Sequence, residues 1–344
     1  MQSHKNMTAI IRFITSKFQC EPLYFKQFIQ PCHHSNTHEG RTQMKTEDTN
    51  IKRLGTFDLD IVEANPIVFH GKPYLLEYIR NRKTEIFKDG QPVSYFRFRD
   101  MTDMKTFSAP FGLGLHMGNA FVKNDHIVVT AVEDWGKGRF YELESDDMVA
   151  WTEPRVILEG EGWEGYNTSI CEADGRYVIV FELGKPREMV NVPFTMFFAE
   201  STDLKNWRII PGAVFGRDIY TGAPLLRYHN GFFYFFHLEG SYEKGFITVV
   251  ARSRDLKTWE NAKRTVMERS QEDRQILPMA ATSFTQEQLM KIACAIHINV
   301  SDLDMCEYGG KLLMCYSWGS QRGVEFMALA EADCSESAFC ESFF

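Results

Sequence analysis

Residues 201–207 read Ser-Thr-Asp-Leu-Lys-Asn-Trp, and this stretch is one of four similar copies spread along the chain. In each copy an aspartate stands four residues before an aromatic residue and is followed by Met or Leu. An Asp side chain at such a place bonds the backbone N–H groups just after it, so each copy indicates a tight turn between two strands. We expect the aromatic ring to wedge against the next repeat. The copies end at Phe107, Trp151, Trp207 and Trp259, which are 44, 56 and 52 residues apart.

A second repeated unit lies between these copies and consists of two apolar runs joined by a turn. Asn-Gly, Asp-Gly and Gly-Gly between strand-like runs are a strong signal for a β-hairpin. The runs are rich in Val, Ile, Phe and Tyr on both sides of the turn, as expected for strands covered on both faces. The turns are centred on Gly71, Asn124-Asp125, Asp174-Gly175, Asn230-Gly231 and Gly309-Gly310.

Together the two units predict an all-β fold, a five-bladed β-propeller of four-stranded antiparallel blades over residues 51–344. The last repeat has only a degenerate Asp turn, and residues 57–61 are expected to complete it and close the ring. The interval before the last hairpin is long, and Thr285 to Gln288 is typical of a capping box. We therefore expect one inserted helix between blades four and five, ending near His297. Residues 1–50 are expected to form an irregular or loosely docked N-terminal extension.

The composition argues against several classes of partner. The chain has 38 Lys and Arg against 46 Asp and Glu, a formal net charge of -8, which does not suit a nucleic-acid partner. No apolar run is long enough to cross a bilayer, so no membrane partner is expected. The eight cysteines form no CxxC pair, which is typical of free thiols in a reducing compartment. Without a clear secretory signal, a cytoplasmic location is expected.

No metal site or other cofactor is predicted. Cys32, His33, His34 and His38 lie close together in the sequence, but their spacing fits no zinc template. A single divalent ion in the propeller channel is the open alternative, with no motif to support it.

The hairpins determine where polar residues gather. The start of the first strand lies beside the end of the second, so both reach one face of the ring. If the first strands line the channel, acids, amides, histidines and aromatic rings from five blades meet there. Such a bowl is typical of a carbohydrate site, because rings stack on sugar C–H groups while carboxylates and amides bind hydroxyls. The residues expected to bind substrate are Glu63, Asn65, Arg80, His116, Asn119, Asn167, His237, Glu239 and Trp318. Trp318 is expected to be a stacking platform, with packing between blades as its alternative.

The Ser-x-Asp-Leu-Lys-x-Trp turns and the five hairpins resemble those of the five-bladed propeller glycosidases, which include glycoside hydrolase families 43, 32, 117 and 130. The resemblance covers residues 51–344 and is more specific for the fold than for the reaction. In families 43 and 32, it implies an Asp, an Asp and a Glu on the first strands of blades one to three. This sequence has Asn65, Asn119 and Asn167 there. An amide neither takes up a proton nor attacks as a carboxylate does, so the chain resembles a divergent member in which other carboxylates act or the site only binds.

Glycoside hydrolysis needs one protonated acid and one ionised base or nucleophile on either side of the scissile bond. Asp302 and Asp304 are two residues apart at the start of a strand, so they are expected to share a face. Asp302 is the predicted base, and Asp304 is expected to tune its pKa as a like charge. Glu182 ends an apolar run, where desolvation favours the protonated form, so it is the predicted acid. Alternatives for the acid are Glu239, Glu133, His116 and His237, the histidines because family 117 uses a histidine as proton donor. A rim salt bridge or a satisfied polar group is the structural alternative for each.

These residues predict a glycoside hydrolase that removes a terminal sugar from an oligosaccharide. One alternative is a catalytically silent carbohydrate-binding propeller, motivated by the three Asn positions. The other is a glycoside phosphorylase similar to family 130, which needs a cationic phosphate pocket. The sugar, its linkage, the stereochemical course and the oligomeric state do not follow from the sequence.

Overall fold

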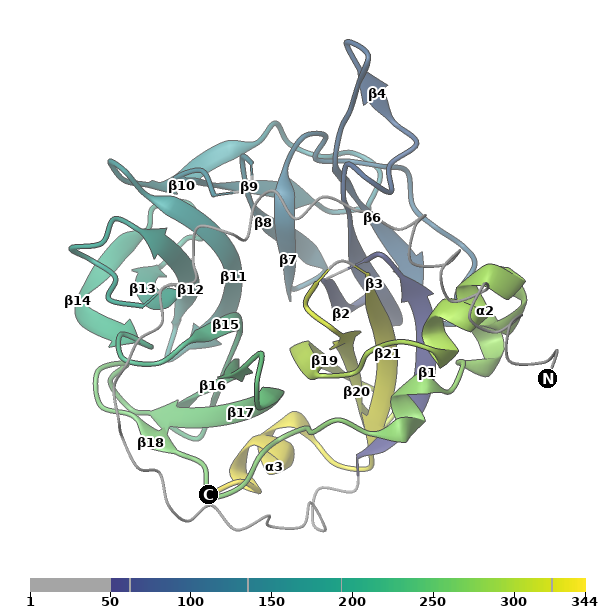
Figure 1. Ribbon diagram of the computed structural model, residues 1–344. Helices are drawn as coiled ribbons and strands as arrows, with labels where there is room; N and C mark the ends of the chain where they lie inside the picture. The colour runs from purple at the N-terminus through teal and green to yellow at the C-terminus, as the bar shows by residue number, and fades with distance from the viewer. Residues whose placement is uncertain (1–50, 62, 135, 193, 323) are drawn as a thin grey trace, which may run out of the picture. The chain divides into compact units, whose positions relative to one another are not determined.

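The computed structural model describes residues 51–344, apart from 62, 135, 193 and 323. The predicted N-terminal extension over residues 1–50, with Cys32, His33, His34 and His38, lies outside the described residues. The described chain forms five antiparallel sheets arranged in a ring about a central channel (Figure 1). The prediction of a five-bladed β-propeller is therefore confirmed.

The first strand of each blade lies nearest the centre of the ring (Figure 1). Each of these strands contacts the first strand of the blade on either side, and the contact between the first and last of them closes the circle. The innermost strands are β2 (Ala64–Phe69), β7 (His116–Lys123), β11 (Glu164–Ala173), β15 (Thr221–His229) and β19 (Asn299–Tyr308).

The second and third strands follow outward in each blade. The second strands are β3 (Lys72–Ile79), β8 (His126–Val132), β12 (Arg176–Lys185), β16 (Phe232–Ser241) and β20 (Lys311–Gly319). The third strands are β6 (Tyr95–Asp100), β9 (Arg139–Ser145), β13 (Thr195–Ser201), β17 (Gly245–Ser253) and β21 (Glu325–Ala332). In all five hairpins between first and second strands, the two central turn residues have positive φ, as at Asp174 (49°) and Gly175 (79°). These turn types match the twist of the flanking strands, which explains why the turn dipeptides located the hairpins correctly.

Four blades have a fourth, outer strand. Three of these strands follow directly in sequence: β10 (Arg155–Glu159), β14 (Arg208–Phe215) and β18 (Glu260–Asn261). In blade one, isolated bridges from Arg99 to Phe107 and from Phe96 to Phe111 take the place of a fourth strand. A two-stranded hairpin, β4 (Phe87–Lys88) with β5 (Gln91–Pro92), is inserted in the same blade and projects from the ring (Figure 1).

Blade five is closed by the start of the described chain. β1 (Lys52–Leu59) pairs antiparallel with β21, so the sheet order is β1-β21-β20-β19. The prediction that residues 57–61 complete this blade is confirmed, with the strand beginning a few residues earlier. The short helix α3 (Glu336–Glu341) follows β21.

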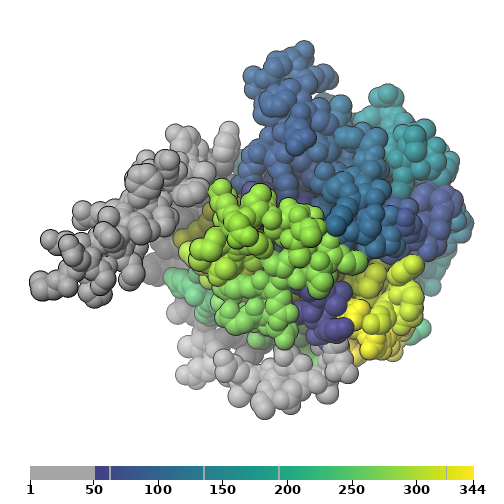
Figure 2. Space-filling view, turned by 90° about the vertical axis from the view of Figure 1, so that its right-hand side faces the viewer, coloured from purple at the N-terminus to yellow at the C-terminus, as the bar shows by residue number. Residues whose placement is uncertain are grey.

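The long interval between blades four and five contains the predicted insertion. It holds two 3₁₀ helices, η1 (Gln271–Arg274) and η2 (Pro278–Ser283), and the helix α2 (Gln286–Ala293). Thr285 and Gln288 form the expected capping box, but α2 ends at Ala293, before the predicted end near His297. Both 3₁₀ helices contact β1, and Figure 2 shows the insertion in green on the outer surface beside the purple start of the described chain. No helix among the described residues is both long and apolar enough to span a membrane.

The repeated Asp turns form as predicted. Asp203 Oδ1 accepts hydrogen bonds from the backbone N–H groups of Lys205 and Asn206, and the other three copies repeat this pattern. The expected direction of the aromatic wedge is wrong in two copies. Trp151 of blade two stacks on Phe111 of blade one at 3.8 Å, so its ring packs on the preceding blade. Trp259 likewise packs on Phe198 of the preceding blade.

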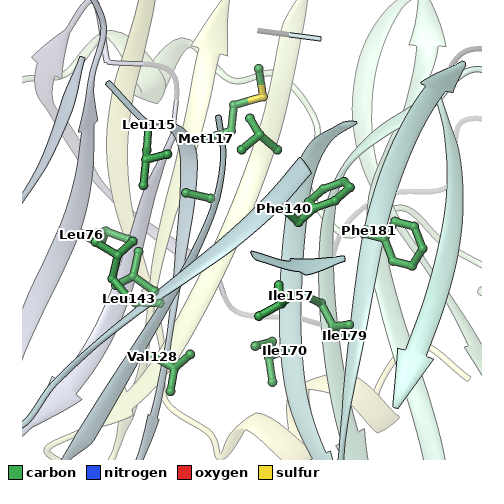
Figure 3. Close-up of a cluster of buried hydrophobic side chains, with 14 of the residues drawn as sticks. Leu76, Leu115, Met117, Val128, Phe140, Leu143, Ile157, Ile170, Ile179 and Phe181 are labelled. Carbon is green, nitrogen blue, oxygen red and sulfur yellow. The ribbon is translucent and has the colours of Figure 1, made fainter. Parts of the chain in front are cut away.

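The hydrophobic core lies between neighbouring blades. Apolar side chains from facing sheets interdigitate there, as in one cluster that joins blades one to three (Figure 3). Leu76, Val128 and Ile179, from blades one, two and three, belong to this cluster, and each is at most 1% exposed. Because both faces of each blade are covered in this way, second strands such as β12 are apolar over consecutive residues, as from Val178 to Phe181. This packing holds the channel-facing strand ends in fixed positions.

Candidate active site

Four of the five innermost strands have a β-bulge near their start. In three of them the bulge includes a non-glycine residue with positive φ, namely Met117 (53°), Ala223 (53°) and Asp302 (52°). A bulge adds one residue to a strand and redirects the side chains around it. The bulges therefore lie near the same end of the channel in these blades, and they set the directions of the side chains that form a site there.

A pocket of about 40 Å³ occupies the channel at this end. Residues from all five blades line it, which confirms the expected meeting of strand ends on one face. Six of the residues singled out in the sequence are among them: Glu63, Asn65, Asn119, Asn167, Asp302 and Asp304.

Asp302 is held by hydroxyl groups from its own blade. Ser301 Oγ donates to Asp302 Oδ2, and the Ser317 hydroxyl also favours the ionised carboxylate. Burial raises the pKa of Asp302, and the two hydroxyl groups and the Arg80 charge oppose that rise. Hydrogen bonds to the charged form are what a general base or nucleophile needs in order to stay ionised.

Glu182 lies on the second strand of blade three and is 3% exposed. Burial, followed by the charge of Glu63, raises its pKa well above the usual range, and the Asp302 charge adds to this rise. The Asn167 side chain and the backbone N–H of Ala223 bond the carboxyl group, while Oε2 has no partner among the described residues. Glu182 is therefore set to hold a proton within the electrostatic range of Asp302.

Glu63 and Arg80 come from the two ends of the blade-one hairpin. Burial, followed by the charge of Asp302, raises the pKa of Glu63 to about 8, while Arg80 lowers it. Burial lowers the pKa of Arg80, and its Nε and one Nη atom are buried without a hydrogen-bond partner among the described residues. The group thus combines one cation with three carboxyls, Glu63, Glu182 and Asp302, whose pKa values burial raises.

Asp304 is not the tuner that the sequence suggested. The bulge between Ser301 and Asp304 breaks the strand alternation on which that prediction depended, and the pKa of Asp302 is raised by burial. The Asp304 carboxylate instead accepts hydrogen bonds from Asn65 Nδ2 at 2.6 Å, Asn119 Nδ2 at 3.0 Å and Arg227 Nη2 at 2.7 Å. Asp304 is thus the centre of a polar hub that joins blades one, two, four and five.

The hub contains two predicted substrate binders. Asn65 is 5% exposed, and its Oδ1 accepts from the backbone N–H of Ala120, so both ends of its amide are used within the protein. Asn65 still lines the pocket, so its role in binding substrate stays a prediction. Asn119 and Asn167 are only half-buried and line the pocket, so their role as substrate binders stays a prediction.

The two histidines are satisfied side chains. His116 bonds Tyr78 and Ser94 through its two ring nitrogens, and burial lowers its pKa. His237 is 1% exposed, and its Nε2 lies 3.2 Å from Glu239 Oε1. Neither ring is available to a sugar in this structure, so their predicted contact with substrate is wrong.

Glu239 is half-buried, and its role stays a prediction. The remaining alternative acid, Glu133, contacts Tyr141 and Arg139 instead.

The prediction that Trp318 is a stacking platform is wrong. Its side chain has no exposed surface, and its ring stacks on Phe326 at 4.4 Å. Its Nε1 donates to Thr56 Oγ1 at 2.8 Å. These contacts lie within blade five and with the insertion, because β1 and the insertion cover this end of β20. Packing between blades stays the alternative interpretation.

One residue near the site was missed, and a second residue, Tyr220, lies at the same face. Glu325 begins β21 and is 4% exposed, and burial raises its pKa to about 8, with the Asp302 charge adding to the rise. Tyr220 precedes β15 and is 37% exposed, and burial followed by the Glu182 charge raises the pKa of its phenol. The sequence does contain a signal for Glu325, because this acid directly precedes an apolar run. Glu182 was selected because it directly follows one.

We searched the described residues of 51–344 for groups of three or more His, Cys, Asp or Glu side chains that could bind a metal ion. These residues contain no such group. The absence of a cofactor stays a prediction, and a divalent ion in the channel stays its open alternative.

No protein-family model matches the chain, and no curated protein matches it in sequence. Solved structures do match. A thermostable family-43 glycoside hydrolase aligns with a TM-score of 0.56 at 10% identity, over 83% of this chain and 94% of that chain. An α-L-arabinofuranosidase from Podospora anserina, in complex with cellotriose, aligns with a TM-score of 0.51 at 11% identity, over 85% and 95% of the two chains.

A third match is a structure from the GH130 family of mannoside phosphorylases, a family that contains glycoside hydrolases targeting β-1,2 mannosidic linkages in Candida mannan. It aligns with a TM-score of 0.50 at 14% identity, over 80% of this chain and 85% of that chain. The chain thus has the fold of the five-bladed propeller glycoside hydrolases. At these identities the likeness concerns the fold, and the chemistry must be argued from the residues of the site.

Proposed function

We propose that this protein is a glycoside hydrolase that removes a terminal sugar from a carbohydrate chain, with Asp302 as base or nucleophile and Glu182 as proton donor. One observation carries the proposal: two buried carboxyls from different blades lie within electrostatic range, and burial raises the pKa of Glu182 well above its usual range, whereas hydroxyl groups oppose the rise at Asp302. Hydroxyl groups stabilise the charge on Asp302, whereas Glu182 is buried with one oxygen unpartnered. Two carboxyls whose surroundings separate their pKa values are the arrangement that glycoside hydrolysis needs.

In the proposed reaction, Glu182 gives its proton to the glycosidic oxygen as the bond from that oxygen to the anomeric carbon breaks. In one route Asp302 takes a proton from a water molecule, and the water oxygen attacks the anomeric carbon. In the other route Asp302 attacks the anomeric carbon itself; water then displaces Asp302 from that carbon and returns a proton to Glu182. Positive charge develops on the sugar ring in the transition state, and the ionised Asp302 stabilises it. A protonated Glu63 adds no competing negative charge beside it.

The floor of the pocket favours the binding of a chain end. Asp304, which lines the pocket, is bonded to three side chains from other blades, so a polar hub crosses the channel. A site with such a floor suits the terminal unit of a chain better than a chain that runs through it.

Carbohydrate binding without hydrolysis is the second candidate, and one observation favours it. Asn65 and Asn119 stand where the resembling families have carboxylates, and both amides are bonded to Asp304. A phosphorylase is the third candidate, for which Arg80 is the nearby cation.

The test compares the parent protein with Asp302→Asn and Glu182→Gln on a panel of aryl glycosides and plant and algal oligosaccharides. Release of reducing sugar measures turnover, and calorimetry measures binding. We expect the parent to hydrolyse at least one substrate, and each variant to lose turnover of the oligosaccharides by about 100-fold or more with the fold intact. Asp174→Asn is the matched control, because Asp174 is exposed in a turn where Asn also adopts positive φ.

Each alternative has its own outcome. Binding without turnover on every sugar would support a silent binding propeller, and turnover that depends on added phosphate would support a phosphorylase. Activity of Asp302→Asn within about threefold of the parent would exclude Asp302 as the base.

A further inference from the structure

Blade five contains a buried run of polar side chains behind Asp302, and Glu325 stands at its far end. Glu325 is the first residue of β21 and pairs with Gly319 of β20. Both of its carboxyl oxygens are buried and make no hydrogen bond of good geometry among the described residues. The Gln321 backbone N–H and the Asn299 side chain lie beside it and lower its pKa, although neither is aligned for a hydrogen bond of good geometry. A buried carboxyl with such poorly aligned donors is costly unless it keeps its proton.

Asn299 connects this carboxyl to the site. Its Nδ2 donates to Ser301 Oγ at 2.9 Å, and Gln321 Nε2 donates to the same oxygen at 3.3 Å. A serine hydroxyl has a single proton to donate. Two amides occupy the acceptor side of Ser301, and Ser301 Oγ donates to Asp302 Oδ2. Ser317 Oγ lies 3.3 Å from Ser301 Oγ, and its own hydroxyl also supports the Asp302 charge.

The orientation of the Asn299 amide decides this pattern. Its Oδ1 is buried and has no partner among the described residues. A neutral Glu325 carries an O–H group that can donate to Asn299 Oδ1, which keeps Nδ2 on Ser301. An ionised Glu325 would attract Nδ2 instead, and the turned amide would present Oδ1 to Ser301. The Ser301 proton would then leave Asp302 for the amide oxygen.

Burial is the largest influence on Glu325 and favours its neutral state. The Gln321 backbone N–H opposes this effect, the Asp302 charge on β19 adds to it, and Arg80 after β3 opposes it, with the pKa raised to about 8 in total. Tyr242, at the end of the β16–β17 hairpin, senses the Glu325 charge, with Arg322 acting in the opposite direction on that phenol.

We propose that Glu325 is a positioning residue for Asp302: as a neutral carboxylic acid it holds the Asn299 amide in the orientation that makes Ser301 donate to Asp302. The catalytic meaning of this arrangement rests on the proposed function. The arrangement itself depends only on hydrogen bonds within blade five, so it is testable without a substrate.

The test follows the titration of Asp302 directly, in protein labelled with ¹³C at the aspartate carboxyl carbons. Asp302→Asn identifies the resonance. We expect the titration midpoint of Asp302 to move up by about one pH unit in Ser301→Ala and in Glu325→Leu, because both remove support for the charged form. In Glu325→Gln it should stay within about 0.3 pH unit of the parent, because the Gln amide replaces the acid as donor to Asn299. Glu331→Leu, an exposed-side change on the same strand that removes surface ion pairs to Lys52 and Lys311, is the control and should leave it unchanged.

Two results would overturn the proposal. One is a Glu325→Leu midpoint equal to that of the parent, and the other is a Glu325→Gln midpoint displaced as far as that of Glu325→Leu. Should Glu325→Leu fail to fold, Asn299→Ala replaces it, with the same upward movement expected because Ser301 loses its closer amide donor. None of these results requires turnover. A protein that hydrolyses no glycoside would refute the proposed function while leaving this test decisive. Where turnover exists, the acidic limb of kcat/KM should move with the midpoint in every variant.

Discussion

The Asn65 amide of blade one donates to the Asp304 carboxylate of blade five, with 2.6 Å between Nδ2 and Oδ2. Both side chains are at most 6% exposed, and Arg227 of blade four supplies the compensating charge. The first and last blades are therefore joined at the channel by a bond that requires an amide at position 65. An aspartate there would place two buried carboxyls in contact.

Asn65→Asp is accordingly expected to destabilise the protein, although it introduces the residue type that the resembling families have at this position. The loss in free energy of unfolding should be about 3 kcal/mol at neutral pH, the scale of an uncompensated buried charge. Urea unfolding at pH 7 measures it, with the exposed turn variant Asn124→Asp as control. A loss below about 0.5 kcal/mol would show that the hub tolerates a second carboxyl, for example as a shared proton.

Trp318→Phe should reduce stability without changing substrate affinity. The variant loses the bond from Nε1 to Thr56 Oγ1 and leaves a space beside Phe326, at a cost of about 1–3 kcal/mol. Tyr220→Ala is the matched comparison, because that ring is 37% exposed beside the site, and it should raise KM with a smaller effect on stability. Thermal unfolding and steady-state kinetics of both variants decide the point. A rise in KM for Trp318→Phe at unchanged stability would restore Trp318 as a substrate contact.

The fold was predictable because its signals are local. Each hairpin turn contains residues that accept positive φ, such as Asn230 and Gly231, and each Asp turn is satisfied within a few residues. The inserted helix carried its own capping box at Thr285. None of these features depends on how distant parts of the chain meet, so the sequence alone was enough to count the blades.

The sequence predicted which face of the propeller carries the site, but not which side chains meet there. Strand ends from five blades do meet there, but the β19 bulge separates Asp302 from Asp304, and strand alternation gives no warning of a bulge. Glu325 was missed because only first and second strands were considered. The third strand runs parallel to the first, so its start reaches the same face. The burial of Trp318 depends on β1 and the insertion, whose packing on blade five is a long-range contact.

Glu182→Gln should separate proton donation from the rest of catalysis. The parent profile of kcat/KM should rise with pH as Asp302 loses its proton and fall as Glu182 loses its own. Both limbs should lie above the usual carboxyl range, because burial raises both pKa values. In Glu182→Gln the amide cannot protonate the leaving oxygen, so the basic limb should disappear. Turnover of alkyl glycosides should fall by about 100-fold or more, whereas nitrophenyl glycosides, whose leaving group needs little protonation, should lose far less.

The comparison of leaving groups makes this assignment specific. A variant that merely disturbs the pocket would slow both kinds of glycoside to a similar extent, and Asn167→Ala, which removes a bond to the Glu182 carboxyl, serves as that reference. Equal losses on alkyl and nitrophenyl substrates, or a basic limb that persists in Glu182→Gln, would assign the proton donor to another group. Glu63 would be the first candidate, because burial and the Asp302 charge raise its pKa to about 8 and its side chain lines the pocket beside Asp302.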